Sequence, residues 1–362
     1  MGDKRIVRVG IIGCGGISWG KHMPSLAQIE NVQMVAFCDI DEGKCKDAME
    51  KYGAEGSKYY TDYKELLKDQ SIEVVHVLTP NISHSEISVA ALESGKHVMC
   101  EKPMAINYAD AKLMLEASKR TGKKLTIGYQ NRFREDSTLL HKLCENDELG
   151  EVYYAKAHAI RRRAVPTWGV FLKEKEQGGG PLIDIGTHSL DLTLWFMNNY
   201  KPKYVVGNTY RKIADQKNPA NEWGPWDSSA FTVEDSAFGF VTMENGATIL
   251  IESSWALNTL DVGEAMTTLS GTKGGADMKD GLRINKVEHN TQMTYNPTPR
   301  GKEVAFFGKK EVNPAFEEAS LWIDAIINDT EPLVKPEEAI VVTRILDAIY
   351  ESAKTGKPVY FD

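Results

Sequence analysis

The chain has 362 residues, of which 42% are hydrophobic and 26% charged, values typical of a globular protein with a sizeable core. At roughly 150 residues per domain, this length predicts about two domains. The net charge of −8 argues against nucleic acid as a partner, because phosphate backbones are bound by positive charge. No apolar stretch approaches the roughly 20 residues of a membrane helix, so no membrane partner is expected.

The cysteines indicate a reducing compartment, because they are odd in number and form no C-x-x-C pair. The apolar residues 9–12 follow a basic start, but a signal peptide needs about 7–15 apolar residues without a glycine break. We therefore expect a cytoplasmic protein. The five cysteines are Cys14, Cys38, Cys45, Cys100 and Cys144.

Short β-type runs alternate with helical patterns over the first 128 residues, which predicts βαβ units and a parallel sheet. Several runs lack inside/outside alternation, as expected where helices cover both sheet faces. The first domain is therefore expected over residues 1–128. The predicted strands are residues 6–12, 33–38, 74–78, 97–100 and 125–128, and the predicted helices are residues 41–51, 83–93 and 108–121.

The first strand leads into Gly13-x-Gly15-x-x-Ser18. Two glycines permit a tight turn and let backbone N–H groups approach a pyrophosphate at a helix N-terminus. The third fingerprint position is normally Gly or Ala, so Ser18 is a departure, although a small one. Asp39 lies 21 residues beyond Ser18 at the end of the second strand, where a carboxylate can bind ribose hydroxyls and repel a 2′-phosphate.

These features predict a Rossmann-type dinucleotide site that takes NAD rather than NADP, since "CDIDEGK" offers no arginine for a 2′-phosphate. The alternative is an ordinary glycine turn in which Asp39 and Asp41 cap the next helix.

Polar residues of "LTPNISHSE" follow the strand at 74–78, at the sheet edge where open α/β sheets bind ligands. Thr79, Pro80, Asn81 and His84 are therefore cofactor candidates. The alternative is that Ser83 and Glu86 form a capping box and that His84 is a surface histidine.

The strand at 97–100 runs straight into Glu101-Lys102-Pro103. Proline pushes the preceding residue out of the helical region, so the backbone of Lys102 is restricted. A loop at the end of a buried strand has no structural need for a lysine. Lys102 is therefore a candidate catalytic residue.

After Gly150 the pattern changes to longer alternating strands at residues 151–163, 235–243 and 247–255, the last two joined by the strong turn Glu244-Asn245-Gly246. Residues 314–356 predict two helices around proline breaks. We expect a substrate-binding α/β domain over residues 129–362 with a large, mainly antiparallel open sheet.

One helix, at residues 181–196, interrupts these strands after three glycines. Asp184 and His188 are four residues apart and share a helix face. An Asp–His pair can act as a general acid/base unit. The alternatives are a structural Asp–His hydrogen bond, or a metal site with His158 as a further ligand; no metal is predicted.

Arginine and tryptophan side chains precede this helix. By strand alternation Arg161 and Arg163 share a face, where they bind substrate hydroxyls or are surface charges. Trp168 can stack on a sugar or cover the nicotinamide. The stretch "NEWGPWDSS" resembles an insertion, with Trp223 and Trp226 in a lid or an oligomer contact.

The chain resembles the Gfo/Idh/MocA family (glucose–fructose oxidoreductase, inositol dehydrogenase, rhizopine catabolism) over nearly its whole length. The resemblance rests on "GIIGCGGIS", "LTPNISH", "HVMCEKPMA", "GGGPLIDIGTHSLDL", "MENGATILIESSW" and "AIYESAKTGKPVYF". It implies an N-terminal Rossmann domain and a C-terminal α/β domain whose open sheet face forms a homo-oligomer. It also implies that Lys102, often with a cis bond to the proline, lies near the reacting hydroxyl, with Asp184 and His188 facing it.

The resemblance implies hydride transfer between NAD and a ring hydroxyl of a sugar, glycoside or cyclitol. Our prediction is C3 of a glucosyl group; the alternatives are an inositol dehydrogenase, a redox-assisted glycosidase that retains NAD, and a nucleotide-sensing regulator. The predicted catalytic residues are Lys102, Asp184 and His188. The predicted cofactor residues are Gly13, Gly15, Gly16, Ile17, Asp39, Ile40, Thr79, Pro80, Asn81, His84, Glu101, Lys102 and Asn131, and the predicted substrate residues are Arg132, Arg161, Arg163, Trp168, Asp184 and His188.

Overall fold

The computed structural model describes residues 5–216, 220–297 and 313–361. The chain forms two compact units: unit 1 comprises Met1–Gln130 and Asn313–Ile340, and unit 2 comprises Asn131–Val312 and Val341–Asp362. The expected boundary at residue 128 lies near the first of these divisions, but residues 313–340 were expected in the second domain. They group with unit 1 because Trp322 and Ile323 pack into its hydrophobic core.

Unit 1 contains a six-stranded sheet in the order β3-β2-β1-β4-β5-β6, with every neighbouring pair parallel. This confirms the predicted parallel sheet. The sequence analysis missed β3, whose three residues are too few for a periodic pattern. The strands are β1 (Val7–Ile12), β2 (Val32–Cys38), β3 (Lys58–Tyr60), β4 (Val74–Val77), β5 (His97–Cys100) and β6 (Leu125–Ile127).

The helices of unit 1 begin where the local chemistry supplies caps. Asp41 accepts hydrogen bonds from the N–H groups of Gly43 and Lys44 and so caps α2, as the helix-cap alternative proposed for Asp41. The capping box at Ser83 does not form, because a 3₁₀ turn precedes α4 and the Ser83 hydroxyl bonds Thr79 and Pro80 instead. The elements are η1 (Ser18–His22), α1 (Met23–Leu26), α2 (Glu42–Tyr52), α3 (Tyr63–Leu67), η2 (Asn81–Ser83), α4 (His84–Glu93), α5 (Tyr108–Thr121) and α9 (Pro314–Ile327).

Unit 2 contains a nine-stranded sheet in the order β14-β13-β12-β11-β7-β10-β9-β8-β15, in which β7 and β10 are the parallel pair. The other pairs are antiparallel, as predicted. The predicted hairpin forms between β9 and β10, with Gly246 at φ +88° in its turn. The strands are β7 (Val152–Ile160), β8 (Pro202–Tyr210), β9 (Ser236–Met243), β10 (Thr248–Ser254), β11 (Gly263–Gly271), β12 (Gly274–Asp277), β13 (Arg283–Glu288), β14 (Thr291–Tyr295) and β15 (Val359–Tyr360).

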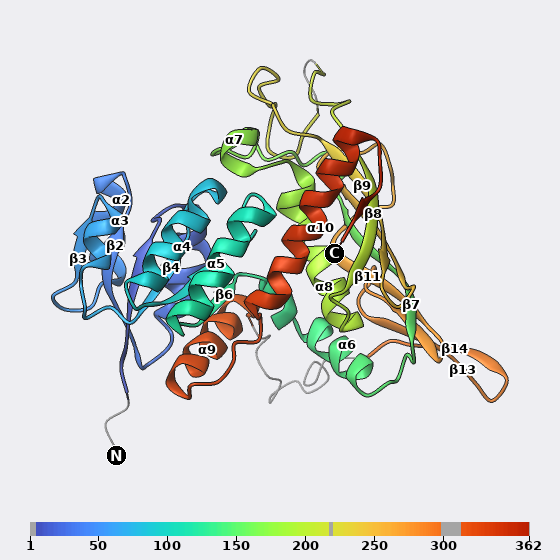
Figure 1. Ribbon diagram of the computed structural model, residues 1–362, viewed down its shortest axis with the longest axis horizontal. Helices are drawn as coiled ribbons and strands as arrows, with labels where there is room; N and C mark the ends of the chain where they lie inside the picture. Colours follow the sequence, from blue (N-terminus) through green and yellow to red (C-terminus); the bar gives the residue numbers. More distant parts are fainter. Residues whose placement is uncertain (1–4, 217–219, 298–312, 362) are drawn as a thin grey trace, which may run out of the picture. The chain divides into compact units, whose positions relative to one another are not determined.

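Helices cover one face of this sheet (Figure 1). Thr193 of α8 lies 2.9 Å from Thr267 of β11, oxygen to oxygen. Ile349 of α10 lies 2.7 Å from where a Cβ would stand on Gly207, so glycine in β8 lets that helix approach closely. The remaining helical elements are η3 (Gln130–Phe133), α6 (Glu135–Glu145), α7 (Glu174–Gln177), η4 (Leu182–Gly186), α8 (Thr187–Met197) and α10 (Pro336–Thr355). Over residues 5–216, 220–297 and 313–361, every helix is too short or too polar to span a bilayer.

Candidate functional site

The glycine-rich turn after β1 has the space that a dinucleotide needs. Gly13 has φ +97°, and a Cβ there would lie 2.6 Å from the backbone of Leu78, so only glycine fits. At Gly15 and Gly16 nothing lies within 4 Å of the position a Cβ would take. The exposed Ile17 follows, and Ser18 is fully buried at the start of η1, in keeping with a small packing residue at the third fingerprint position.

Asp39 is held beside this turn. One carboxylate oxygen accepts a hydrogen bond from the N–H of Cys14 at 2.9 Å, and the other accepts from the N–H of Asp41 at 3.0 Å. Asp39 therefore braces the glycine turn rather than capping α2. The next side chain, Ile40, is 95% exposed. A fixed carboxylate at the end of β2 is the group that favours ribose hydroxyls over a phosphate.

The loop after β4 lies next to the glycine turn, because β1 and β4 are neighbouring strands. Pro80 is exposed, and Thr79 and Asn81 are partly buried. His84 is 1% exposed, with Nδ1 2.8 Å from the carbonyl oxygen of Pro103 and Nε2 2.9 Å from that of Thr79. This burial excludes the surface-histidine alternative and places the imidazole between two loops of the sheet edge.

The Lys102–Pro103 peptide bond is cis, as the family resemblance implied. The N–H of Lys102 donates to Oε2 of Glu101 at 3.0 Å. Glu101 is itself buried, and its Oε1 accepts from Lys21 Nζ at 2.7 Å and lies 2.8 Å from Nε2 of His22. Burial opposes ionisation of Glu101, but the attraction of Lys21 and the bond to His22 outweigh it and hold the pKa of Glu101 well below its usual value.

The helix predicted at residues 181–196 begins with the π-helical turn η4, and α8 follows it. A π turn closes i→i+5 hydrogen bonds and occurs frequently at functional sites. Asp184 lies in this turn, and its Oδ2 accepts a hydrogen bond from Nε1 of the fully buried Trp255 at 3.0 Å. His188 follows in the first turn of α8 and is 8% exposed. The sequence analysis missed Trp255, because a tryptophan at the end of an alternating strand signals only core.

Two side chains far along the chain explain the glycines before this helix. A Cβ on Gly179 would lie 2.0 Å from the hydroxyl oxygen of Tyr350, and one on Gly180 would lie 2.2 Å from the carbonyl oxygen of Glu234. The Glu234 carboxylate accepts hydrogen bonds from the N–H groups of Gly180 and Leu182 at 2.8 and 3.1 Å and from Tyr350 at 2.9 Å. Burial raises the pKa of Glu234 to about 7. Glu234 and Tyr350 had no local signal in the sequence.

The predicted substrate residues of unit 2 are divided between ion pairs and an aromatic surface. Strand β7 ends at Ile160, so Arg161 and Arg163 lie beyond it and do not share a strand face. Arg161 forms a two-pronged ion pair with Glu264, with N–O distances of 2.6 and 2.8 Å, and Arg163 donates to Asn258 at 2.6 Å.

Trp168 is 51% exposed and packs edge-to-face against Trp223, ring centroids 4.9 Å apart. The guanidinium of Arg161 lies over the ring of Trp223 at 5.4 Å. Trp226 instead packs in the core with Phe231 and donates to a backbone carbonyl, so it is not part of a lid.

Arg132 is completely buried, and its guanidinium pairs with Asp191 of α8 at 2.6 and 2.9 Å. This ion pair links η3 to α8. It does not support the predicted substrate role of Arg132. Asn131, in the same 3₁₀ turn, is partly buried. His158 pairs with Glu252 at 3.0 Å, and the described residues contain no group of three or more His, Cys, Asp or Glu side chains arranged to hold a metal ion.

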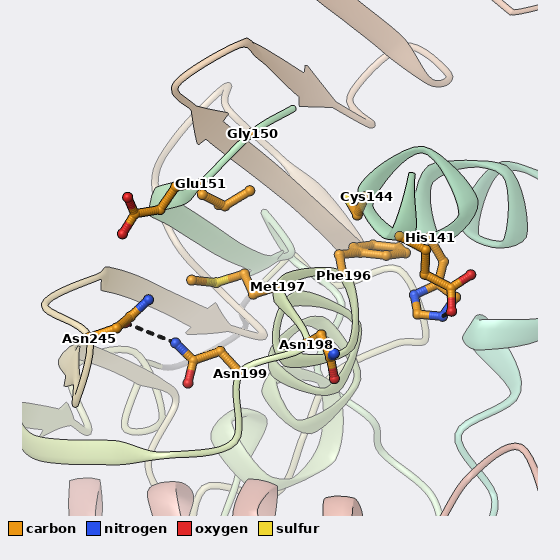
Figure 2. Close-up of a pocket in the computed structure, with 11 residues that line it drawn as sticks. His141, Cys144, Gly150, Glu151, Phe196, Met197, Asn198, Asn199 and Asn245 are labelled. Carbon is orange, nitrogen blue, oxygen red and sulfur yellow. Dashed lines mark hydrogen bonds and ion pairs between the residues drawn. The ribbon is translucent and has the colours of Figure 1, made fainter. Parts of the chain in front are cut away.

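Unit 2 contains a cavity of about 280 Å³. Figure 2 shows the residues that line it. It lies between α6, the end of α8 and the β9–β10 turn, where Asn199 donates a hydrogen bond to Asn245 at 3.0 Å. The residues that line it include none of the predicted catalytic or substrate residues. We therefore do not assign the reaction to this cavity.

Comparison with known families matches both parts of the chain. The family described as "Oxidoreductase family, NAD-binding Rossmann fold" (GFO_IDH_MocA) matches residues 7–129. The family described as "Oxidoreductase family, C-terminal alpha/beta domain" (GFO_IDH_MocA_C) matches residues 141–361.

Individual proteins are similar over different lengths. D-glucoside 3-dehydrogenase of Escherichia coli K12 is 32% identical over 353 residues, 98% of this chain and 97% of the relative. Inositol 2-dehydrogenase of Salmonella typhimurium LT2 is 32% identical over 198 residues, 54% of this chain and 56% of the relative. The crystal structure of aldose-aldose oxidoreductase from Caulobacter crescentus has a TM-score of 0.80 and 25% identity, covering 99% of this chain and 100% of that one.

Proposed function

Because the chain belongs to the Gfo/Idh/MocA oxidoreductase family, a family of NAD-type enzymes of sugars and polyols, we propose that it oxidises C3 of a glucosyl group within a glycoside. The observation that carries this proposal is the match to D-glucoside 3-dehydrogenase, which extends over 98% of the chain. The match to inositol 2-dehydrogenase covers 54% and makes a cyclitol the second candidate substrate.

NAD fits the open turn at Gly15 and Gly16, and Asp39 would bind its ribose hydroxyls. The bound cofactor supplies the hydride acceptor. When the alcohol becomes a ketone, its carbon loses a hydride and its oxygen loses a proton. We assign the proton to the imidazole of His188, and orientation and polarisation of the hydroxyl to the ammonium group of Lys102. We assign to Asp184, held by Trp255, the binding of a substrate hydroxyl and the support of His188.

The exposed aromatic surface of Trp168 and Trp223 supports a glycoside over a free sugar. Trp168 and Trp223 are 51% and 42% exposed, and their rings are held at right angles by their mutual contact. Aromatic faces stack on flat or apolar groups, and an aglycone adds such a group beyond the glucosyl ring, where a free sugar or a cyclitol has none. We propose that this pair contacts the aglycone.

We further propose that the protein is a homo-oligomer that pairs through the sheet face opposite α8 and α10. Phe240 and Val206 are register partners on that face, and both are about two-fifths exposed, at 41% and 39%. Exposed aromatic and aliphatic side chains on an open sheet face are the kind of surface that a second copy covers. A Phe240→Glu variant is then expected to lower the molar mass measured by light scattering, whereas an unchanged mass contradicts this interface.

The proposed reaction is tested by NADH formation with NAD in excess, across glucose, simple glucosides, aryl glucosides and inositols. We expect NADH with glucosides, and none from the Lys102→Ala variant. NADH formation with inositols alone would show that the substrate is a cyclitol and not a glycoside. Glycoside cleavage without net NADH formation would support a redox-assisted glycosidase. No NADH formation with any of these compounds would contradict the dehydrogenase proposal.

A further inference from the structure

Unit 1 buries a group of five titratable side chains from four separate elements. Lys21 and His22 belong to η1, His76 to β4, Glu101 follows β5, and Glu318 belongs to α9. All five are at most 6% exposed. In the sequence, Lys21, His22, His76 and Glu101 lie between the glycine turn and Lys102, and Glu318 comes from α9. The reaction assigned above uses none of the five as a proton carrier.

The carboxylate of Glu101 links these side chains to the backbone of Lys102. Its Oε1 faces the first helix, receiving Lys21 Nζ at 2.7 Å and lying 2.8 Å from His22 Nε2. Its Oε2 receives the N–H of Lys102 at 3.0 Å. Since the two oxygens belong to one rigid carboxylate, a shift of Lys21 or His22 moves the atom that holds the Lys102 backbone.

The protonation states are consistent with this arrangement. Burial, aided by the charge of Lys21, lowers the pKa of His22, so its neutral ring carries one proton. That proton lies on Nε2, where it is donated to Glu101, and Nδ1 accepts from Nδ1 of His76 at 3.1 Å. Lys21 is thereby the one cation of the group, because burial opposes its charge but Glu101 and Glu318 keep its pKa raised.

A second buried side chain holds the other side of the same segment. Nδ1 of His84 lies 2.8 Å from the carbonyl oxygen of Pro103, one residue beyond Lys102. Lys102 is thus flanked by an anchored N–H on one side and an anchored carbonyl on the other. Of these two anchors, the Glu101 carboxylate also forms an ion pair with Lys21.

Stability alone does not explain the ion pair. Lys21 also lies 2.8 Å from Glu318, so one buried ammonium group serves two buried carboxylates. Burial and repulsion from Glu101 raise the pKa of Glu318 to about 7, although the attraction of Lys21 opposes this shift. Apolar residues of similar volume often stabilise a core as well as or better than buried ion pairs do.

We propose that Lys21 is a positioning residue for Lys102, acting through Glu101 from the helix that follows the cofactor turn. The inference rests on the proposed function, because it assumes that Lys102 acts on the substrate. It couples the helix that begins at the dinucleotide turn to the residue that orients the reacting hydroxyl. A displacement of about 1 Å at a reacting group costs up to about 100-fold in rate, so a small loss of register is sufficient.

The test is the Lys21→Met variant, compared with Lys96→Met. Lys96 is 1% exposed in the same unit and bonds the backbone oxygens of Asp69 and Ile72, so it controls for loss of a buried lysine. We expect Lys21→Met to lower kcat about 10- to 100-fold. The KM for the glucoside and the Kd for NAD, from quenching of tryptophan fluorescence, are expected to stay within about twofold, and Lys96→Met to keep its kcat.

A second variant separates positioning from folding. A Cβ on Gly128 would lie 3.1 Å from the Glu101 carboxylate, so Gly128→Ala displaces Glu101 without removing a charge and is expected to lower kcat as well. This variant keeps the proposal testable if Lys21→Met fails to fold.

The outcomes distinguish the inference from the function beneath it. Wild-type turnover in Lys102→Ala overturns the proposed function and the inference together. An inactive Lys102→Ala variant beside an unchanged kcat in folded Lys21→Met overturns the inference alone. If Lys21→Met does not fold, an unchanged kcat in Gly128→Ala overturns the inference instead.

Discussion

Replacement of Glu234 by glutamine is expected to remove a pH dependence from the stability of the protein. Burial raises the pKa of this carboxyl from 4.5 to about 7 in the folded state. Between these values the folded protein binds the proton more strongly than the unfolded chain does. Stability contributed by this group is therefore present at pH 4.5 and is lost as the pH rises to about 7. At about 1.4 kcal/mol per pH unit, that window corresponds to about 3 kcal/mol.

The assay is urea denaturation of wild type and Glu234→Gln at several pH values from about 4.5 to 8. We expect the decrease in unfolding free energy across this range to be smaller in the variant by about 3 kcal/mol. Glu318, whose pKa is also raised to about 7, is present in both proteins and cancels in the difference. The exposed Glu244 of the hairpin turn provides the control, Glu244→Gln, which is expected to follow wild type. Parallel pH profiles of wild type and Glu234→Gln would refute the reasoning.

Three further changes follow from the site geometry. Asp39→Ala removes the carboxylate that repels a 2′-phosphate, so the ratio of kcat/KM for NAD over NADP is expected to fall at least about tenfold; an unchanged ratio contradicts the assignment. Trp255→Phe removes the N–H that donates to the buried Asp184, a loss that costs about 1–3 kcal/mol. The kcat measured in steady-state assays is expected to fall about tenfold. A wild-type kcat would show that this hydrogen bond does not contribute to the reaction. Arg132→Met leaves the buried Asp191 without its cation and is expected to lower the free energy of unfolding in urea by about 3–5 kcal/mol. Adding Asp191→Leu to the same chain is expected to recover most of this loss. A loss below about 1 kcal/mol in Arg132→Met would contradict a structural ion pair.

The sequence predicted several of the elements that have a clear local pattern. The parallel sheet of unit 1 and the β9–β10 hairpin follow from apolar runs and from Glu244-Asn245-Gly246, whose turn type requires a positive φ. Three-residue β3 and two-residue β15 are shorter than any period and were missed. The predicted elements also lacked the helix α6 and the strands β8, β11, β12, β13 and β14. The π turns η1 and η4 could not be predicted, because an extra residue in a helical turn leaves no signature in a single sequence.

The candidate site divides along a similar line. Gly13, Asp39 and Lys102 were predicted as site residues because each follows a strand end, where position alone indicates exposure to a ligand. Arg132 was assigned to substrate on the same ground, but its buried pairing with Asp191 is a tertiary contact that no local pattern reveals. Glu234 likewise acts on a helix more than 50 residues away in the chain.

The most direct test of the proposed reaction is to follow a deuterium label from the sugar to the cofactor. A glucoside deuterated at C3 is incubated with the enzyme and NAD, and the NADH formed is analysed by mass spectrometry. Our account predicts that NADH carries the deuterium, that the same glucoside labelled at C2 or C4 gives unlabelled NADH, and that Lys102→Ala gives none. Unlabelled NADH from the C3-deuterated glucoside would contradict it.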